Sequence, residues 1–279
     1  MWVGQQLADG LDFWGFLGSL ILGGIILGIY TGLLGYVGAK TGLSLDLLSQ
    51  RAFGEKGSYL PSAMTSFTQI GWFGVGSFVS GGTATPNFAR FAKDGKSGAI
   101  TTVVAFFIGN SLMFFFGAVS SIFVGGNDIF EVMVRLNLFY LAVLVLGLNI
   151  WTTNDNALYT AGLGLANIFH QKKKTMVLIS GIIGTILSVW LYYNFCGWLN
   201  ILNCTLPPVG MILVLAYFMN KEDFETDQPK LKTIDWFAVA GVILGAIVAN
   251  LLHWGIASIN GMVVAAVCYC VGQAVNKRK

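Results

Sequence analysis

Long runs of apolar residues, separated by short polar segments, dominate the pattern along the chain. A helix that crosses a bilayer needs about 20 predominantly apolar residues, and each long run meets that length. The runs predict membrane-spanning helices near residues 13–39, 98–124, 138–169, 175–195, 197–219, 234–253 and 255–275. We therefore expect an all-α, multi-spanning membrane protein with a single transmembrane domain over residues 1–279.

Residues 59–96 fit this pattern less well, because only 59–82 is apolar and the rest is polar. Basic residues mark cytoplasmic loops, and Lys56 before this stretch and Arg90 within its polar part place both flanks in the cytoplasm. The chain must therefore cross the membrane from the cytoplasm and return, yet this stretch has enough apolar residues for only one span. Two interpretations stay open: a re-entrant hairpin over 59–96 that turns near Gly74–Gly82, or the loss of a segment from the middle of the chain.

Composition excludes several classes of protein. The chain is 55% hydrophobic and only 10% charged, which excludes an ordinary soluble enzyme and a disordered chain. A formal net charge of +3 is too small to indicate nucleic acid as a partner. No nucleophile–base set, phosphate-binding loop or metal-ligand spacing is found, so we expect no enzymatic activity and no cofactor. Basic loops alternate with spans along the chain, and this alternation places the C-terminus in the cytoplasm. We also expect membrane lipid to surround the spans.

The most polar mid-span segment lies within the predicted helix 138–169. Four of its side chains recur at helical spacing and so share one face: Asn149, Thr152, Thr153 and Asn156. Neutral oxygens of this kind suit a hard monovalent cation such as sodium. The alternative is hydrogen bonding between helices, but the density of polar groups favours a functional site. The role of Asp155 stays open between a proton relay, a cation partner, the cap of a broken helix and the partner of an interior hydrogen-bond donor.

A second polar and aromatic cluster lies within residues 68–82. Gln69 and Trp72 are three residues apart, so one helical face offers an amide beside a flat indole. Phe78 and Ser80 follow after a glycine-rich break. Two aromatic faces with an amide between them suit a flat, polar heteroaromatic ring. The alternative is an ordinary packing or interfacial tryptophan, and the pattern alone does not decide between the two.

Four segments resemble the purine-cytosine permease family, also named nucleobase–cation symporter family 1. They are residues 27–43, 68–76, 147–159 and 207–210, and the run NIWTTNDNA from Asn149 is the most specific of them. The resemblance implies twelve helices, ten of which form two inverted five-helix repeats with broken first and sixth helices. It also implies a bacterial inner-membrane transporter that imports cytosine, or a related pyrimidine base, by sodium-coupled alternating access.

The resemblance assigns roles to the two clusters. Trp72 and Phe78 would sandwich the pyrimidine ring. The edge of the ring would be hydrogen-bonded by Gln69, by Ser77 or Ser80, and by Asn149 or Asn154. Thr152 and Thr153 would supply side-chain oxygens to sodium, together with the backbone carbonyl of Asn149.

The chain departs from the family pattern in two places. Met1 aligns within the first helix of the family, so part of that helix is absent. The third-helix motif runs directly into the sixth-helix motif at Gly76–Ser77, as if the fourth and fifth helices were missing. Because half of the sodium site belongs to the first helix, we expect coupled transport by this shortened chain to be impaired or absent. A second hypothesis stays open: a truncated, transport-incompetent structural membrane protein of the same family.

Overall fold

The computed structural model describes residues 12–75, 83–125, 129–226, 229, 231–252 and 254–276, and every regular element in these residues is a helix. Five helices are long and apolar enough to cross a membrane: Phe13–Thr41, Gly95–Val124, Lys173–Leu191, Gly197–Met219 and Ala257–Asn276. The prediction of an all-α, multi-spanning architecture is therefore confirmed.

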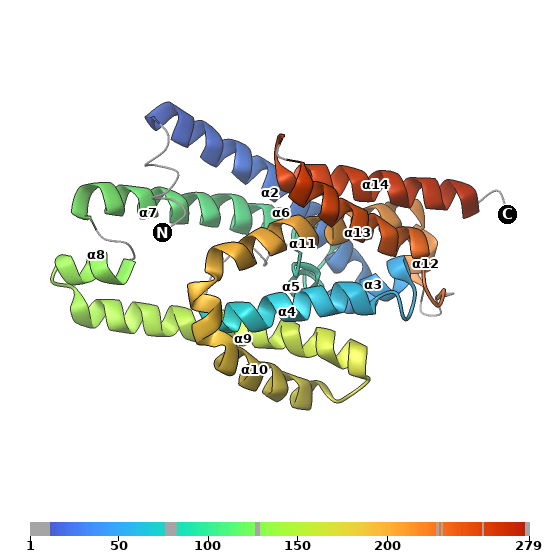
Figure 1. Ribbon diagram of the computed structural model, residues 1–279, viewed down its shortest axis with the longest axis horizontal. Helices are drawn as coiled ribbons and strands as arrows, with labels where there is room; N and C mark the ends of the chain where they lie inside the picture. Colours follow the sequence, from blue (N-terminus) through green and yellow to red (C-terminus); the bar gives the residue numbers. More distant parts are fainter. Residues whose placement is uncertain are drawn as a thin grey trace.

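The helices follow one another with short connections (Figure 1). Their bounds are α2 Phe13–Thr41, α3 Leu45–Phe53, α4 Tyr59–Val75, α5 Pro86–Ala89, α6 Gly95–Val104, α7 Asn110–Val124, α8 Ile129–Arg135, α9 Phe139–Phe169, α10 Lys173–Tyr193, α11 Phe195–Met219, α12 Lys221–Glu225, α13 Trp236–Leu251 and α14 Ala257–Asn276. A π-helical segment, Ala105–Gly109, joins α6 to α7. In the stretch 59–96, the structure has α4 and α5, and the turn expected near Gly74–Gly82 lies mostly outside the described residues.

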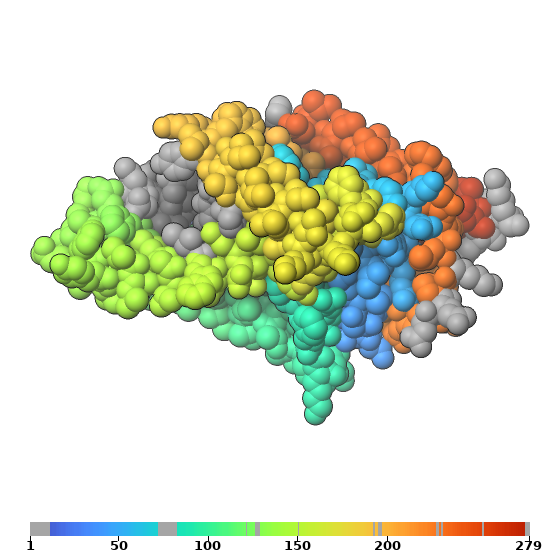
Figure 2. Space-filling view, turned by 90° about the horizontal axis from the view of Figure 1, so that it is seen from below, coloured from blue at the N-terminus to red at the C-terminus, as the bar shows by residue number. Residues whose placement is uncertain are grey.

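Two groups of helices pack around separate apolar clusters. In the first, α2, α3, α11, α13 and α14 share a core that includes Leu34, Phe53, Leu213 and Tyr269. In the second, α9, α10 and α11 meet around Trp198, and α4 packs on both α9 and α10. Helix α8 and the start of α9 lie at one end of the molecule (Figures 1 and 2).

Large apolar side chains cover much of the outer surface. Ile186 on α10 is 73% exposed and Tyr140 on α9 is 87% exposed. A soluble protein rarely exposes so much continuous apolar surface, whereas lipid tails accept it without cost. The outward faces of these helices therefore match a membrane environment.

Helix α2 approaches α5 closely because Gly38 has no side chain. A Cβ atom at Gly38 would lie 2.7 Å from Cα of Pro86, which is a backbone atom and cannot rotate away. We expect Gly38→Ala to lower the free energy of unfolding in detergent by about 1–3 kcal/mol. Gly23→Ala on the same helix is the matched control, because nothing lies within 4 Å of its added Cβ. Equal unfolding midpoints for both variants in a denaturant titration would contradict this packing.

Candidate functional site

The first part of the candidate site is the second half of α4. Gln69 is buried, with 7% of its surface exposed. Trp72 follows less than one turn later on the same helix, which continues to Val75. The side chain of Trp72 is outside the described part of the structure, and so are the predicted site residues Ser77, Phe78 and Ser80.

A tryptophan of α11 presses against α4 between Gln69 and Trp72. The Trp198 ring is 3% exposed, and a Cβ atom at Gly71 would lie 2.2 Å from its Cζ2 atom. Close packing of an indole on a helix backbone is feasible only where the facing residue is glycine. Sequence reasoning missed this contact. The one available signal was Gly71 itself, since a glycine inside a helix costs stability unless a neighbour uses the space.

The second part of the candidate site is the middle of α9. This helix is continuous from Phe139 to Phe169, so Asp155 does not cap a helix break. Asn149 and Thr152 are exposed, and Thr153 and Asn154 are half-buried. The polar face predicted from the spacing is therefore open along a helix long enough to span a bilayer.

The threonine hydroxyls on this face bond within their own helix. Thr152 donates to the backbone oxygens of Asn149 at 3.0 Å and of Leu148 at 3.1 Å. Thr153 donates to the side-chain oxygen of Asn149 at 3.3 Å. Several neutral oxygens thus gather within one turn of α9, a donor set that fits a sodium ion and needs no change of protonation. The described residues hold no group of three or more His, Cys, Asp or Glu side chains that could bind a metal ion.

Helices α4 and α9 run antiparallel and in contact. Ser66 donates to the backbone oxygen of Ala161 at 3.1 Å, and Asn167 donates to Ser62 at 2.9 Å. At a rise of 1.5 Å per residue, this register places Gln69 level with about residue 158 of α9, and Trp72 level with about residue 155. The packing therefore brings the two predicted clusters to neighbouring levels of adjacent helices.

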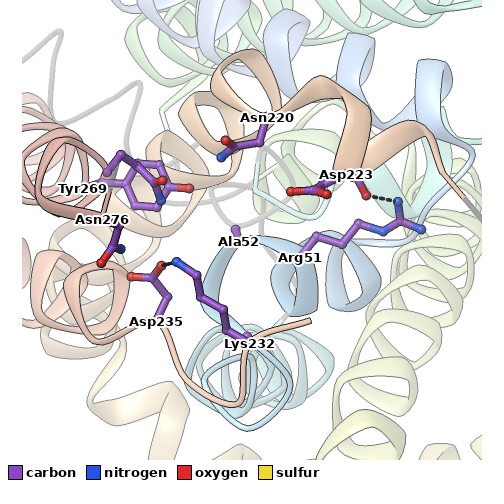
Figure 3. A pocket seen from close by; sticks show the side chains of 10 residues that line it. Arg51, Ala52, Asn220, Asp223, Lys232, Asp235, Tyr269 and Asn276 are labelled. Atoms are coloured by element: carbon purple, nitrogen blue, oxygen red, sulfur yellow. Dashed lines mark hydrogen bonds and ion pairs between the residues drawn. The ribbon is translucent and has the colours of Figure 1, made fainter. Parts of the chain in front are cut away.

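A separate polar pocket of about 260 Å³ lies among α3, α12, α13 and α14 (Figure 3). Three of its charged side chains, Arg51, Lys232 and Asp235, form contacts within the chain. Lys232 pairs with Asp235 at 2.9 Å, and Arg51 donates to the backbone oxygen of Asp223 at 2.6 Å. Asp235 also caps α13 by accepting from the amide of Ala238. None of the predicted site residues lines this pocket, and its contacts hold the connecting segment before α13 in place.

An all-helical bundle with apolar outer faces and one open polar helix face is the architecture of a multi-pass membrane transporter. The chain matches the family model described as "Permease for cytosine/purines, uracil, thiamine, allantoin" in two parts, residues 1–84 and 74–275. It is 36% identical to the cytosine permease of Escherichia coli strain K12 over 372 positions, which cover the whole chain and 88% of that relative. The allantoin permease of Bacillus subtilis strain 168 is 34% identical over 82 residues, 29% of the chain and 16% of that relative.

A solved structure shares the fold. It is Mhp1, a nucleobase-cation-symport-1 family transporter, in a closed conformation with bromovinylhydantoin bound. The TM-score is 0.75 at 15% identity, and the match covers 97% of this chain and 87% of Mhp1. The chain therefore belongs to the family of permeases for cytosine/purines, uracil, thiamine and allantoin, as the resemblance predicted. Its relatives are transporters and not enzymes.

The alignment with the E. coli cytosine permease shows that the chain is shorter than this relative. It extends over 372 positions while the chain has 279 residues, so at least 93 positions have no residue here. The two parts of the family match meet at residues 74–84, where the third-helix and sixth-helix motifs adjoin. This favours the loss of an internal segment over a re-entrant hairpin across 59–96, and the prediction of a shortened chain is confirmed.

Proposed function

We propose that the protein is a secondary active transporter that imports cytosine, or a related pyrimidine base, by sodium-coupled alternating access. The observation that carries the proposal is the antiparallel packing of α4 on α9, whose register brings Gln69 and Trp72 close to the level of the polar segment of α9. The E. coli relative is a cytosine permease, which supports the choice of cytosine. We also propose a bacterial inner-membrane location with the C-terminus in the cytoplasm.

The open polar face of α9 supports a transport path. Asn149, Thr152 and Asn156 are exposed in the middle of α9, a helix of 31 residues that is long enough to cross a bilayer. Polar side chains at this depth are costly against lipid, so they must face water or other protein groups. A water-filled path beside α9 satisfies them and gives a polar base access to the centre of the membrane.

Recognition of the base would combine stacking with hydrogen bonding. The Trp72 indole and the Phe78 ring would hold the two faces of the pyrimidine. The amide of Gln69 has donor and acceptor groups that would match the edge of the ring, with Asn149 or Asn154 and Ser77 or Ser80 as further partners. A ring whose edge does not match these groups would lose hydrogen bonds of about 0.5–1.5 kcal/mol each and would bind more weakly.

Sodium would bind at the Asn149 carbonyl and the hydroxyls of Thr152 and Thr153. Because Asn149 also belongs to the proposed base site, ion and base would share one helix turn. Each ligand then strengthens the binding of the other by the same factor. Coupling of this kind allows a sodium gradient to drive import.

Uptake of radiolabelled cytosine by liposomes that contain the purified chain tests this function. We expect an inward sodium gradient to increase the initial rate over an equal gradient of choline. Excess unlabelled cytosine should suppress the uptake. Uptake no higher than in protein-free liposomes, from a preparation that still binds cytosine, would contradict transport and favour the shortened structural protein.

A further inference from the structure

Helix α3, a short helix in the connection between α2 and α4, carries a buried carboxyl group. Asp46 is 5% exposed and accepts a hydrogen bond from Ser62 of α4 at 2.6 Å. A carboxylate removed from water is costly unless it is paired. Among the described residues, Asp46 forms no ion pair.

An amide next to Asp46 joins three helices. Asn167 of α9 accepts from Gln50 of α3 at 2.6 Å. It donates to Ser58, just before α4, at 3.0 Å and to Ser62 of α4 at 2.9 Å. Ser62 thus bonds to both Asp46 and Asn167. We call these contacts the α3–α4–α9 junction. It lies at the opposite end of α4 from Trp72, near the cytoplasmic loop.

Unpaired buried polar atoms gather around this junction. Within the described part of the chain, four buried side-chain atoms on α3, on α9 and on α5 with its C-cap have no hydrogen-bond partner: Ser49 Oγ, Asn87 Nδ2, Arg90 Nε and Thr160 Oγ1. Buried polar groups are normally satisfied, so the polar groups of these elements are incompletely paired in the packed arrangement.

The charged and titratable groups around Asp46 come from each neighbouring element. Arg90, after α5, donates to the hydroxyl of Tyr159 on α9, and its charge acts on Asp46 without a direct contact. Lys173 of α10 lies 3.6 Å from the centre of the Tyr159 ring. Tyr59 of α4 bonds to His170 at the end of α9. Arg90 is therefore the cation available to an ionised Asp46.

We propose that Asp46 is a proton-binding site whose protonated form favours the packed α3–α4–α9 junction and whose ionised form favours an open junction. The O–H bond of the carboxyl group breaks, its electron pair stays on the carboxylate, and the proton passes to cytoplasmic water. Arg90 then balances the new negative charge. The consequence for transport rests on the proposed function, because α4 and α9 carry the candidate base and sodium sites.

The electrostatics of the junction agree with this assignment. Burial raises the pKa of Asp46 to about 6, against smaller opposite effects of the Ser62 hydrogen bond and the Arg90 charge. A raised carboxyl pKa means that the packed junction favours the protonated form. The resulting stabilisation is complete below about pH 4, decreases as the pH rises, and is lost above about pH 6.

Infrared titration of the purified protein tests the site without any transport step. A protonated carboxyl group has a C=O stretching band that the ionised group and histidine lack. We expect wild type to lose such a band around pH 6, whereas ordinary carboxyl groups lose theirs around pH 4. The band should be absent in Asp46→Asn and present in Asp223→Asn, an exposed aspartate on α12. Identical titrations of wild type and Asp46→Asn would overturn the proposal.

A second variant keeps the test decisive if Asp46→Asn does not fold. Ser62→Ala removes the donor to Asp46, so the midpoint of the same band should move to higher pH. An unchanged midpoint would overturn the assignment. Cytosine binding is measured on the same preparations. A missing band in wild type that binds cytosine contradicts only the proton site, whereas a titrating band in wild type that binds no base contradicts only the proposed function.

Discussion

Replacing Trp72 by alanine is expected to remove detectable cytosine binding in calorimetry. Stacking of a base on an aromatic side chain contributes about 1–3 kcal/mol, so its loss weakens binding about 5- to 160-fold. Trp72→Phe keeps an aromatic face and should retain part of the affinity.

Trp236→Ala is the matched control for this experiment. Trp236 begins α13 and is 69% exposed, far along the chain from the candidate site. Its replacement should leave cytosine affinity unchanged. Wild-type affinity in Trp72→Ala would contradict the stacking role and with it the proposed orientation of the base.

Thr152→Val and Thr153→Val are expected to abolish the effect of sodium on cytosine binding. Valine keeps the shape of threonine but replaces an oxygen ligand by a methyl group. Each variant removes one of the proposed oxygen ligands, so sodium should bind too weakly to strengthen the binding of cytosine. The measurement compares cytosine affinity in sodium with that in choline at equal ionic strength.

Thr185→Val on α10 controls for the loss of a threonine hydroxyl from a spanning helix. Thr185 donates to the backbone oxygen of Gly181 at 2.8 Å, as Thr152 does within α9. It should keep the full sodium effect. A normal sodium effect in both α9 variants would contradict the assignment of the ion site.

The long helices could be predicted from sequence because their apolar runs are dictated by bilayer thickness. The polar face of α9 followed from residue spacing alone, since Asn149, Thr152 and Asn156 repeat at the helical period. Whether that helix was continuous could not be derived. Asn and Asp favour caps and breaks as well as polar faces, and only the structure shows that α9 passes through Asp155 without a break.

Contacts between distant segments lay beyond sequence reasoning for a different reason. Asp46 lies in the first turn of the short helix α3, where a solvated carboxylate is the ordinary expectation, and its burial depends on Ser62 and on the packing of α9. In the sequence, Trp198 is one of many apolar residues in a predicted spanning helix. Its contact with Gly71 depends on where α11 crosses α4. Both features arise from tertiary packing, which local patterns do not encode.

Equilibrium binding of radiolabelled cytosine to the purified chain, with and without sodium, tests directly whether this chain binds the base together with sodium. We expect saturable binding that unlabelled cytosine displaces and that sodium strengthens relative to choline. Retention of label that neither saturates nor exceeds the protein-free control in either salt would contradict it.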